Sequence, residues 1–417
     1  MKLASLKKIV KKNRKLHIFL YIFRYLKSAL NYLSYLFLYN LRTRNQINKR
    51  YKKRTINLKN FEIAKLEEAI LDFIDLKKIG GFKFKYSEDV EIETLYSSVF
   101  ACISLGLFNR IEDKQDWASY FDSHQNELDG LFYDLNTCSE SYTKTDYWGA
   151  RHLALIASSA YIYLGHTPKY KFKFLEQYYD IAFLKSWINT IPWDNTKKLF
   201  DGDIDNKIMH IGCLLQFQRD FFDDKEASKA LEYLKKELIK NLNQDLGVWG
   251  YFDSTNNYQT SRAIQFFYHL MPIFIYDNNI DSFDFEKICN LTLSTQNSYG
   301  GFSPKVNSSA CEDIDSIFIL LFLVDRCSYE STQKILDSIE KAFEWIMINQ
   351  VEDGGFVFKL DESFTYGHKN MFSARNTGSM FASWFRILSI AFIYNKLSPI
   401  NCRKFNLIYS PGYIIKV

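Results

Sequence analysis

The stretch QNSYGGFSPKVNSSACEDIDSIFIL, residues 296–320, contains the two features around which the chain is organised. It opens with a Gln, continues through a Gly-Gly-Phe turn, and ends in three acidic residues that begin a strongly apolar segment. The two glycines permit the positive φ that a turn after a helix requires. The turn recurs along the chain and predicts the architecture, whereas the acidic cluster occurs once and is the first candidate for chemistry.

Similar turn signals recur from residue 80 onward. Their aromatic positions follow one another at steps of 50, 68, 49, 53 and 54 residues, and the longest step predicts an insertion around residues 168–192. Such a period accommodates two helices with two connections and is typical of repeat folds. Six turns therefore predict six helical hairpins that close into a ring. The turns are Gly80-Gly81-Phe82, Asp129-Gly130-Leu131-Phe132, Leu199-Phe200-Asp201-Gly202, Leu246-Gly247-Val248-Trp249, Gly300-Gly301-Phe302 and Gly354-Gly355-Phe356.

Hydrophobic periodicity indicates which helices belong to each layer of the ring. Inner helices need apolar side chains on nearly all sides, as in residues 150–164, 317–324 and 380–393. Outer helices should be amphipathic, as in residues 226–240 and 331–348. The aromatic content of 17%, with scarce Gly and Pro, also favours long helices over a strand-rich sandwich. We predict an all-α (α/α)6 toroid at residues 56–395 and a C-terminal tail at 396–417.

Residues 1–55 read as a basic, aromatic leader with 16 Lys and Arg and no acidic residue. Of the 53 basic residues, 37 remain for the rest of the chain, against 48 acidic ones. An acidic body does not favour nucleic-acid binding. Arg24 and Lys27 interrupt the apolar part of the leader, so a membrane-spanning helix is not expected.

Two interpretations of the leader stay open. A basic amphipathic helix can lie on an anionic membrane surface, which predicts a protein peripheral to the membrane at its cytoplasmic face. The alternative is a helix that packs on the body and keeps its charges in water. The seven Cys are scattered and include no CxxC, which indicates a reducing compartment.

Three turns carry an amide as well as glycine. Residues 244–249 have the pattern Q-x-x-G-x-W, and residues 296–302 and 350–356 have one residue more and Phe in place of Trp. This pattern resembles the QW repeat of the squalene-hopene cyclase, terpenoid cyclase and protein prenyltransferase β-subunit superfamily. In physical terms Gly forms the turn, the aromatic fills the gap between hairpins, and the Gln amide bonds backbone groups at a helix end. The resemblance implies a funnel lined by inner helices, with the chemical residues near the start of an inner helix.

The acidic cluster resembles the D-x-D-D motif of class II terpenoid cyclases. Asp313 and Asp315 match its first two acids, and Ser316 stands in place of the third. The resemblance implies that Asp315 protonates an alkene or epoxide. Burial and the neighbouring Glu312 and Asp313 are expected to keep Asp315 protonated by raising its pKa.

Two other interpretations of this segment are open. Cys311, Asp313 and the distant His368 resemble the zinc ligands of the protein prenyltransferases, in a changed order, and their residue types suit zinc. Alternatively, Glu312, Asp313 and Ser316 only cap a buried helix, where the free N–H groups and the helix dipole favour acids. Our expectation is that the protein uses no cofactor.

Polar and aromatic residues also occur near the starts of other inner helices, and we predict that they line one mouth of the ring. There, Arg and His opposite the acids could hold a phosphate or carboxylate. For His269, alone on its helix, core packing is the alternative. The predicted substrate-binding residues are Trp148, Arg151, His152, Arg262, His269, Arg375 and Trp384.

Three functions follow from these features. The first is a terpenoid-cyclase-like enzyme that acts on an isoprenoid or another lipid, possibly lipid-linked, with Asp315 as general acid. The second is a carbohydrate-active (α/α)6 enzyme of bacterial surface-polysaccharide biosynthesis that uses paired carboxyl groups. The third is a non-catalytic ring that binds a partner at the membrane. Neither a P-loop, a GxSxG nor an HExxH motif occurs in the sequence.

Overall fold

The computed structural model describes residues 40–53, 56–137 and 144–415. Residues 40–53 form a helix that belongs to a unit of its own, and the body begins at Arg54. The part of the predicted leader before residue 40 lies outside the described residues. Among the described helices, none is both long enough and apolar enough to cross a bilayer.

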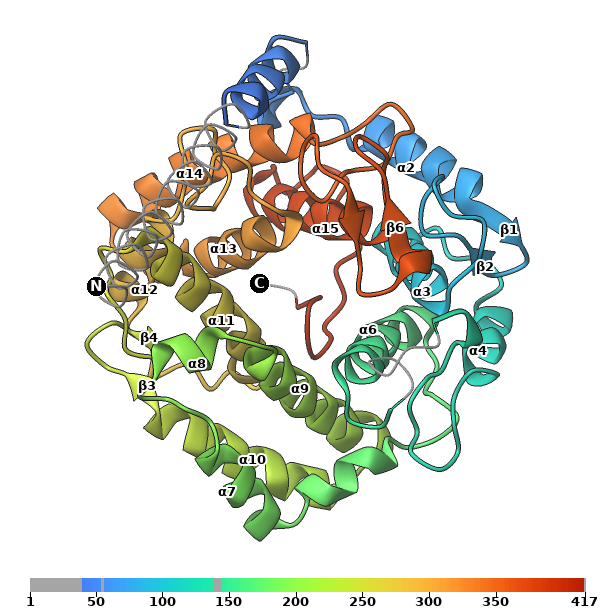
Figure 1. Cartoon of the computed structure of the whole chain (residues 1–417), viewed down its shortest axis with the longest axis vertical. Coiled ribbons are helices and arrows are strands. Elements are labelled where there is room, and N and C mark those ends of the chain that lie inside the picture. Colours follow the sequence, from blue (N-terminus) through green and yellow to red (C-terminus); the bar gives the residue numbers. More distant parts are fainter. Residues whose placement is uncertain (1–39, 54–55, 138–143, 416–417) are drawn as a thin grey trace, which may run out of the picture. The chain divides into compact units, whose positions relative to one another are not determined.

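Within the described body, six helices form a closed inner ring (Figure 1). Each contacts the next in chain order, and the last of them, α15, returns to contact the first, α3. Their side chains are buried on nearly all sides, as predicted for residues 150–164, 317–324 and 380–393. The inner helices are α3 (Leu95–Leu107), α6 (Trp148–Leu164), α9 (Ile204–Phe222), α11 (Asn257–Ile275), α13 (Ala310–Leu323) and α15 (Met380–Leu397).

The outer helices bury one face only. In α10 the buried residues recur at helical spacing along one stripe, and α10 packs against α9 and α7. Between α6 and α9 the chain forms the 3-10 helix η3, α7 and α8, which accounts for the extra length predicted around residues 168–192. The outer and connecting helices are η1 (Leu58–Asn60), α2 (Ile63–Lys77), α4 (Lys114–Asp122), η2 (Leu135–Thr137), η3 (Lys173–Tyr178), α7 (Ile181–Asn189), α8 (Thr196–Phe200), α10 (Lys225–Lys240), α12 (Phe285–Leu293), α14 (Tyr329–Ile348) and η4 (Lys369–Met371).

Amide side chains hold several of the turns that lead into inner helices. Gln296 Nε2 donates to the carbonyl of Gly300 at 2.9 Å and to that of Ser338, in the next outer helix, at 2.8 Å. Gln350 makes the equivalent bond to the carbonyl of Gly354 at 2.9 Å. The amide thus ties its own turn, and in the first case also ties that turn to the neighbouring hairpin.

The assignment of Gln244 to this role is wrong. Asn243 donates to the carbonyl of Gly250 at 2.8 Å, whereas Gln244 contributes its backbone carbonyl to a lysine. The sequence analysis also missed one amide-held turn, in which Gln125 Nε2 donates to the carbonyl of Gly130 at 2.8 Å.

The short antiparallel strand pairs are β1 (Lys78–Gly80) with β2 (Lys83–Phe84), β3 (Leu242–Asn243) with β4 (Val248–Trp249), and β5 (Phe364–Thr365) with β6 (Phe372–Ser373).

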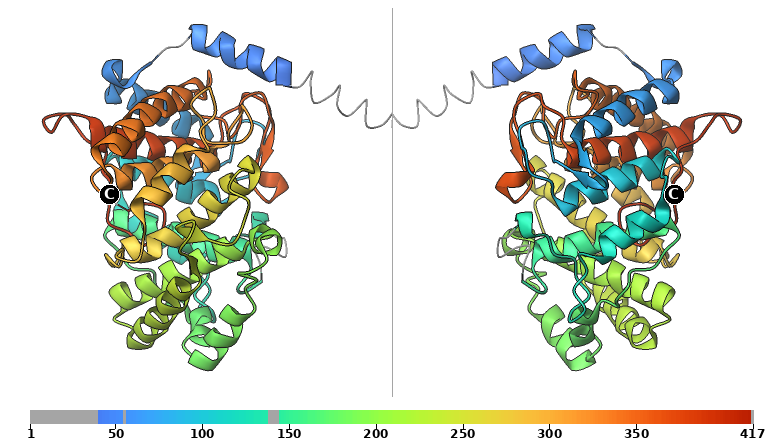
Figure 2. Two further views of the ribbon diagram at one scale, coloured as in Figure 1. Left: turned by 90° about the vertical axis from the view of Figure 1, so that its left-hand side faces the viewer. Right: turned by 90° about the vertical axis from the view of Figure 1, so that its right-hand side faces the viewer.

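The two ends of the inner helices lie at opposite faces of the body. The left view of Figure 2 shows the β5–β6 hairpin, which precedes α15, at one face and the segment that follows α15 at the other. We call the first the helix-start face, formed by the loops that precede the inner helices, including residues 303–309 and 358–379. The second is the tail face, crossed by residues 398–409.

Candidate functional site

The first turns of neighbouring inner helices contact one another, so their side chains gather at the helix-start face. Tyr96 in α3 donates its hydroxyl to the carbonyl of Gly149 in α6 at 2.6 Å. Arg262 in α11 pairs with Asp205 in α9 at 2.6 Å. Polar groups near the starts of different inner helices therefore contact one another.

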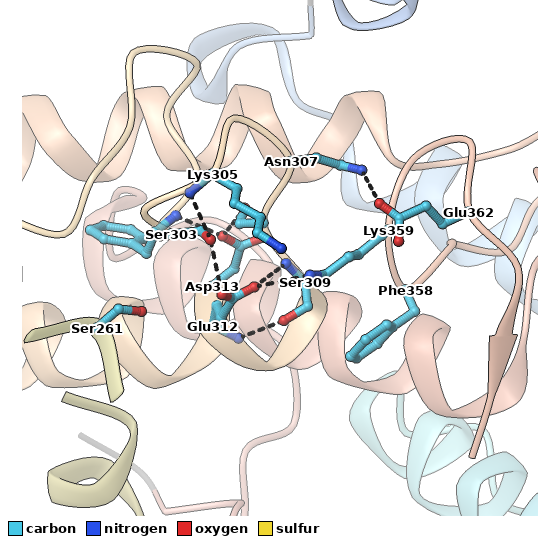
Figure 3. A network of polar contacts seen from close by, with 12 residues as sticks. Ser261, Ser303, Lys305, Asn307, Ser309, Glu312, Asp313, Phe358, Lys359 and Glu362 are labelled. Carbon is cyan, nitrogen blue, oxygen red and sulfur yellow. Dashed lines mark hydrogen bonds and ion pairs between the residues drawn. The ribbon is translucent and has the colours of Figure 1, made fainter. Parts of the chain in front are cut away.

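Glu312 belongs to the cap of α13 (Figure 3). Its backbone N–H donates to Ser309 Oγ at 3.2 Å, and its carboxylate accepts from the Ser309 N–H at 2.7 Å, which is a capping box. The carboxylate also accepts from Ser303 Oγ at 2.9 Å and lies 3.7 Å from Lys359 Nζ. The capping interpretation is therefore correct for Glu312.

Asp313 does not face the interior as a free acid. Its carboxylate accepts from the Phe302 N–H at 2.9 Å, Ser308 Oγ at 2.6 Å, Trp345 Nε1 at 2.9 Å and Arg386 Nη1 at 2.8 Å. Trp345 lies in the outer helix α14 and Arg386 in α15, so this carboxylate joins both layers and two hairpins. Four donors occupy the acceptor positions of a carboxylate, so the geometry favours a structural role for Asp313 over the predicted catalytic one.

Asp315 is the acid that remains unengaged. It is 1% exposed, and Oδ1 has no hydrogen-bond partner among the described residues. Burial raises the pKa of Asp315 well above its usual range. The charge of Arg262 lowers this pKa, whereas the charges of Asp205, Glu312 and Asp313 raise it, and Asp205 has the largest effect of the three. A raised pKa is what the sequence analysis expects of Asp315, but the acidic residue with the largest effect on it, Asp205, comes from another helix. A carboxyl group with a raised pKa can donate a proton.

Asp205 holds His269 and Arg262 together. Its Oδ2 accepts from Arg262 Nη1 at 2.6 Å and lies 2.8 Å from His269 Nδ1. Burial raises the pKa of Asp205, but the charges and hydrogen bonds of His269 and Arg262 outweigh burial and hold that pKa well below its usual range. An ionised carboxylate only accepts, so His269 carries a proton on Nδ1. In the neutral ring, Nε2 is then the nitrogen that can accept a proton.

Two further imidazoles, those of His152 and His210, are buried in the ring. Trp148 stacks on His152 with ring centroids 5.2 Å apart, and Tyr366 places its hydroxyl 3.1 Å from His152 Nδ1. Burial lowers the pKa of His152 to about 3, so the ring is neutral. His210 lies 5.4 Å from His152, measured between ring centroids, and neither of its ring nitrogens has a partner among the described residues. Burial, followed by the charges of neighbouring groups, lowers the pKa of His210 as well.

The remaining predicted binding residues take different places. Arg151 is buried and pairs with Asp203 at 2.8 Å, which suits a structural role. Trp384 lies inside the ring and stacks on Phe100 with centroids 5.2 Å apart. Arg375 is exposed in the loop before α15, at the helix-start face, and its part in binding stays a prediction. His269, paired with Asp205, is not a lone residue packed into the core.

The structure does not assemble the alternative zinc ligands. His368 caps η4 by accepting from the Asn370 N–H at 3.2 Å, and Asp313 is bound to Arg386. No group of three or more His, Cys, Asp and Glu side chains in the described part of the chain has an arrangement that could hold a metal ion. Cys311, Asp313 and His368 therefore do not come together as the alternative interpretation requires.

Sequence reasoning missed several residues of the site, among them Asp205, His210 and Tyr268. Asp205 carried a local signal, because it is an acid in the first turn of an inner helix, as Asp313 is in α13. His210 interrupts an apolar run and also carried a local signal. Tyr366 and Tyr413 reach the interior from a loop and from the tail, and nothing near them in the sequence predicts that.

Comparison with solved structures identifies similar chains at low identity. A polysaccharide lyase shares 11% identity and a TM-score of 0.47, with 81% of this chain and 99% of that chain covered. The GH76 α-mannanase of Bacteroides thetaiotaomicron shares 11% identity and a TM-score of 0.44, with 81% and 97% covered. A possible GH105 member from Klebsiella pneumoniae shares 14% identity and a TM-score of 0.34, with 80% and 93% covered. These similarities carry no argument about activity.

No curated protein matches the chain. The sequence model of the prenyltransferase alpha-alpha toroid domain matches residues 12–184 and 208–365, which is most of the chain. This match agrees with the closed ring of inner helices and with the resemblance carried by the glycine turns. The chain therefore belongs to the prenyltransferase alpha-alpha toroid domain family.

Proposed function

We propose that the protein is an enzyme that acts on carbohydrate by acid–base chemistry inside the toroid. The observation that carries the proposal is a pair of carboxyl groups from two inner helices whose pKa values are shifted in opposite directions. The pKa of Asp315 is raised, first by burial, and the pKa of Asp205 is lowered by His269 and Arg262 against the effect of burial. A protonated carboxyl near an ionised one separates two tasks: the first can donate a proton, and the second can hold a histidine base by hydrogen bonding.

In this proposal Asp315 is the general acid and His269 the general base. Asp205 orients His269 through Nδ1, which directs Nε2 to the substrate, and it is a positioning residue. Asp315 donates its proton to a leaving oxygen, while His269 accepts a proton from water or from a carbon next to a carboxylate. The first route is hydrolysis and the second is elimination, and both suit a sugar polymer.

The polar groups in the ring interior favour a sugar over an isoprenoid. Protonation of an alkene leaves a carbocation, which needs walls without nucleophiles. Here the neutral imidazoles of His152 and His210 lie in the same ring interior, and His269 and Arg262 surround Asp205. A neutral imidazole would trap a carbocation, whereas it can hydrogen-bond sugar hydroxyls. The lipid reaction therefore ranks second, although the bare, protonated Asp315 also suits it.

A panel of neutral and uronate-containing oligosaccharides tests the proposal, with new reducing ends reporting hydrolysis and a new conjugated double bond reporting elimination. Asp315→Asn and His269→Gln should each lower turnover about 100-fold or more, the usual contribution of one acid or base. Glu312→Gln, in the cap of α13, is the matched control and should stay within about twofold of the unchanged protein.

Circular dichroism and thermal melting establish that each variant is folded. Unchanged turnover in Asp315→Asn would remove Asp315 from the mechanism. Turnover of a lipid extract with none of the glycans cleaved would favour the cyclase-like reaction. Binding of a glycan without any product would favour the non-catalytic ring.

A further inference from the structure

The segment that follows α15 closes the tail face of the ring. Asn395 ties this segment to its own helix, with Nδ2 donating to the carbonyl of Phe405 at 2.8 Å and Oδ1 accepting from the Phe405 N–H at 2.9 Å. The Asn406 N–H donates to the carbonyl of Leu107 at the end of α3 at 2.8 Å. The Tyr163 hydroxyl, at the end of α6, donates to the carbonyl of Asn406 at 2.8 Å. Residues 403–409 are therefore fastened to several inner helices.

Beyond this anchor the chain turns into the ring (Figure 1). We call residues 410–415 the tail tip; all six are buried. The ring of Tyr413 lies 5.7 Å from that of His152 and 5.7 Å from that of Trp384, measured between centroids. Burial raises the pKa of the Tyr413 hydroxyl, and the charges of Asp315 and Asp205 add to this rise, so the tip lies near the acid–base groups. Gly412 makes this turn possible, because its φ is +103°.

The wall around the tail tip is polar and lacks partners. In the described part of the chain, no hydrogen bond reaches either ring nitrogen of His210, the hydroxyl of Tyr268, Oδ1 of Asp315 or Nε1 of Trp384. All four residues are buried and come from four different inner helices. A buried polar group without a hydrogen-bond partner destabilises a fold, so four together call for an explanation. The tip brings Tyr413, Ile414 and Ile415 into the ring, and these mostly apolar side chains provide few hydrogen-bond partners for the polar groups.

The hydrogen bonds that hold the tip are few compared with those of the anchor. Ser410 Oγ lies 3.0 Å from Ser159 Oγ in α6, and the Ser410 N–H donates within the tip to the carbonyl of Ile414 at 3.2 Å. The Gly412 N–H faces the thiol of Cys213 in α9; burial raises the pKa of that thiol, and this contact lowers it. The tip is thus held mainly by packing, which a competing ligand can replace.

We infer that the tail tip occupies a subsite for a polyhydroxylated ligand, and that the ligand displaces the tip to reach His210, Tyr268 and Asp315. Sugar hydroxyls both donate and accept, so they can satisfy a neutral imidazole, a phenol and a protonated carboxyl together. The identity of the ligand rests on the proposed function, whereas the mobility of the tip does not. Tip displacement would couple substrate entry to exposure of the general acid.

Cys213 reports the position of the tip directly. N-ethylmaleimide labelling of the intact protein, followed by peptide mass spectrometry, should modify Cys213 faster than Cys102, which is buried in α3 and becomes reactive only on global unfolding. Removing the tip by ending the chain after Tyr409 should accelerate Cys213 labelling about 10-fold or more and leave Cys102 unchanged, because only local cover is lost. Equal, slow labelling of both cysteines in the intact protein would overturn the inference.

A locked tip provides a second test should the shortened chain fail to fold. The Oγ atoms of Ser159 and Ser410 are 3.0 Å apart, so the double variant Ser159→Cys/Ser410→Cys can form a disulfide. Oxidation should suppress Cys213 labelling and the turnover of any cleaved glycan, and dithiothreitol should restore both. Labelling and turnover that do not respond to the lock would overturn the inference. Lock-sensitive labelling with no glycan cleaved would support the mobile tip and contradict the carbohydrate activity.

Discussion

Glu312, Asp313 and Asp315 lie within four residues of one another, yet they have three different environments. Glu312 caps its helix, Asp313 is saturated by four donors, and Asp315 is buried without a partner at Oδ1. Successive residues of a helix point in directions about 100° apart, so neighbours in the sequence face different surroundings. An acidic cluster is therefore a poor guide to which of its members reacts.

Asp313→Ala should destabilise the protein strongly. Arg386, 1% exposed, would lose its ion-pair partner, and a buried charge left alone costs about 3–5 kcal/mol. Urea denaturation followed by circular dichroism measures this loss. Glu312→Gln is the control from the same turn and should cost about 1 kcal/mol or less, because the amide can still accept in the cap. Equal effects of the two changes would contradict the structural role given to Asp313.

At the scale of elements, the turns that lead into inner helices are the repeated unit. Their geometry depends on an amide side chain six or seven residues before an aromatic, and Gln or Asn can supply it. This tolerance explains why the fourth turn was assigned to Gln244 although Asn243 makes the bond. The chemistry of the turn is specific, but the amide's position can move by one residue.

Gln296→Ala should destabilise the protein, because the side chain bonds the carbonyls of both Gly300 and Ser338. Losing two such bonds costs about 1–3 kcal/mol. Gln244→Ala is the matched control: its backbone carbonyl, which the substitution preserves, accepts from Lys287, and the change should stay within about 0.5 kcal/mol. Thermal melting of the two variants side by side measures the difference. A larger loss for Gln244→Ala would show that the amide was correctly assigned at first.

At the scale of the whole molecule, ring closure brings the first and last inner helices together. Phe100 in α3 stacks on Trp384 in α15 with ring centroids 5.2 Å apart, although nearly 300 residues of chain separate them.

The basic leader is a separate feature of the chain, and we propose that it binds an anionic membrane surface. Its 16 basic residues without a single acid support electrostatic attraction to acidic lipid.

Removing residues 1–55 should abolish cosedimentation with vesicles that contain phosphatidylglycerol. The full chain should bind these vesicles more weakly as salt rises, because the attraction is screened within about 10 Å at 0.1 M ionic strength. Vesicles of phosphatidylcholine alone are the control and should bind little of either protein. Retention of the shortened protein on anionic vesicles would place the membrane contact in the body instead.

The sequence alone determined the toroid, because turn spacing and hydrophobic periodicity are local properties that repeat in every hairpin. It also singled out Asp315, since an acid beside an apolar run can be recognised from the sequence alone. Only the tertiary structure decided that Asp205 and His269, 64 residues apart, form a pair, and that residues 410–415 fill the ring. Those contacts depend on which helices meet when the ring closes, and no local pattern encodes that meeting.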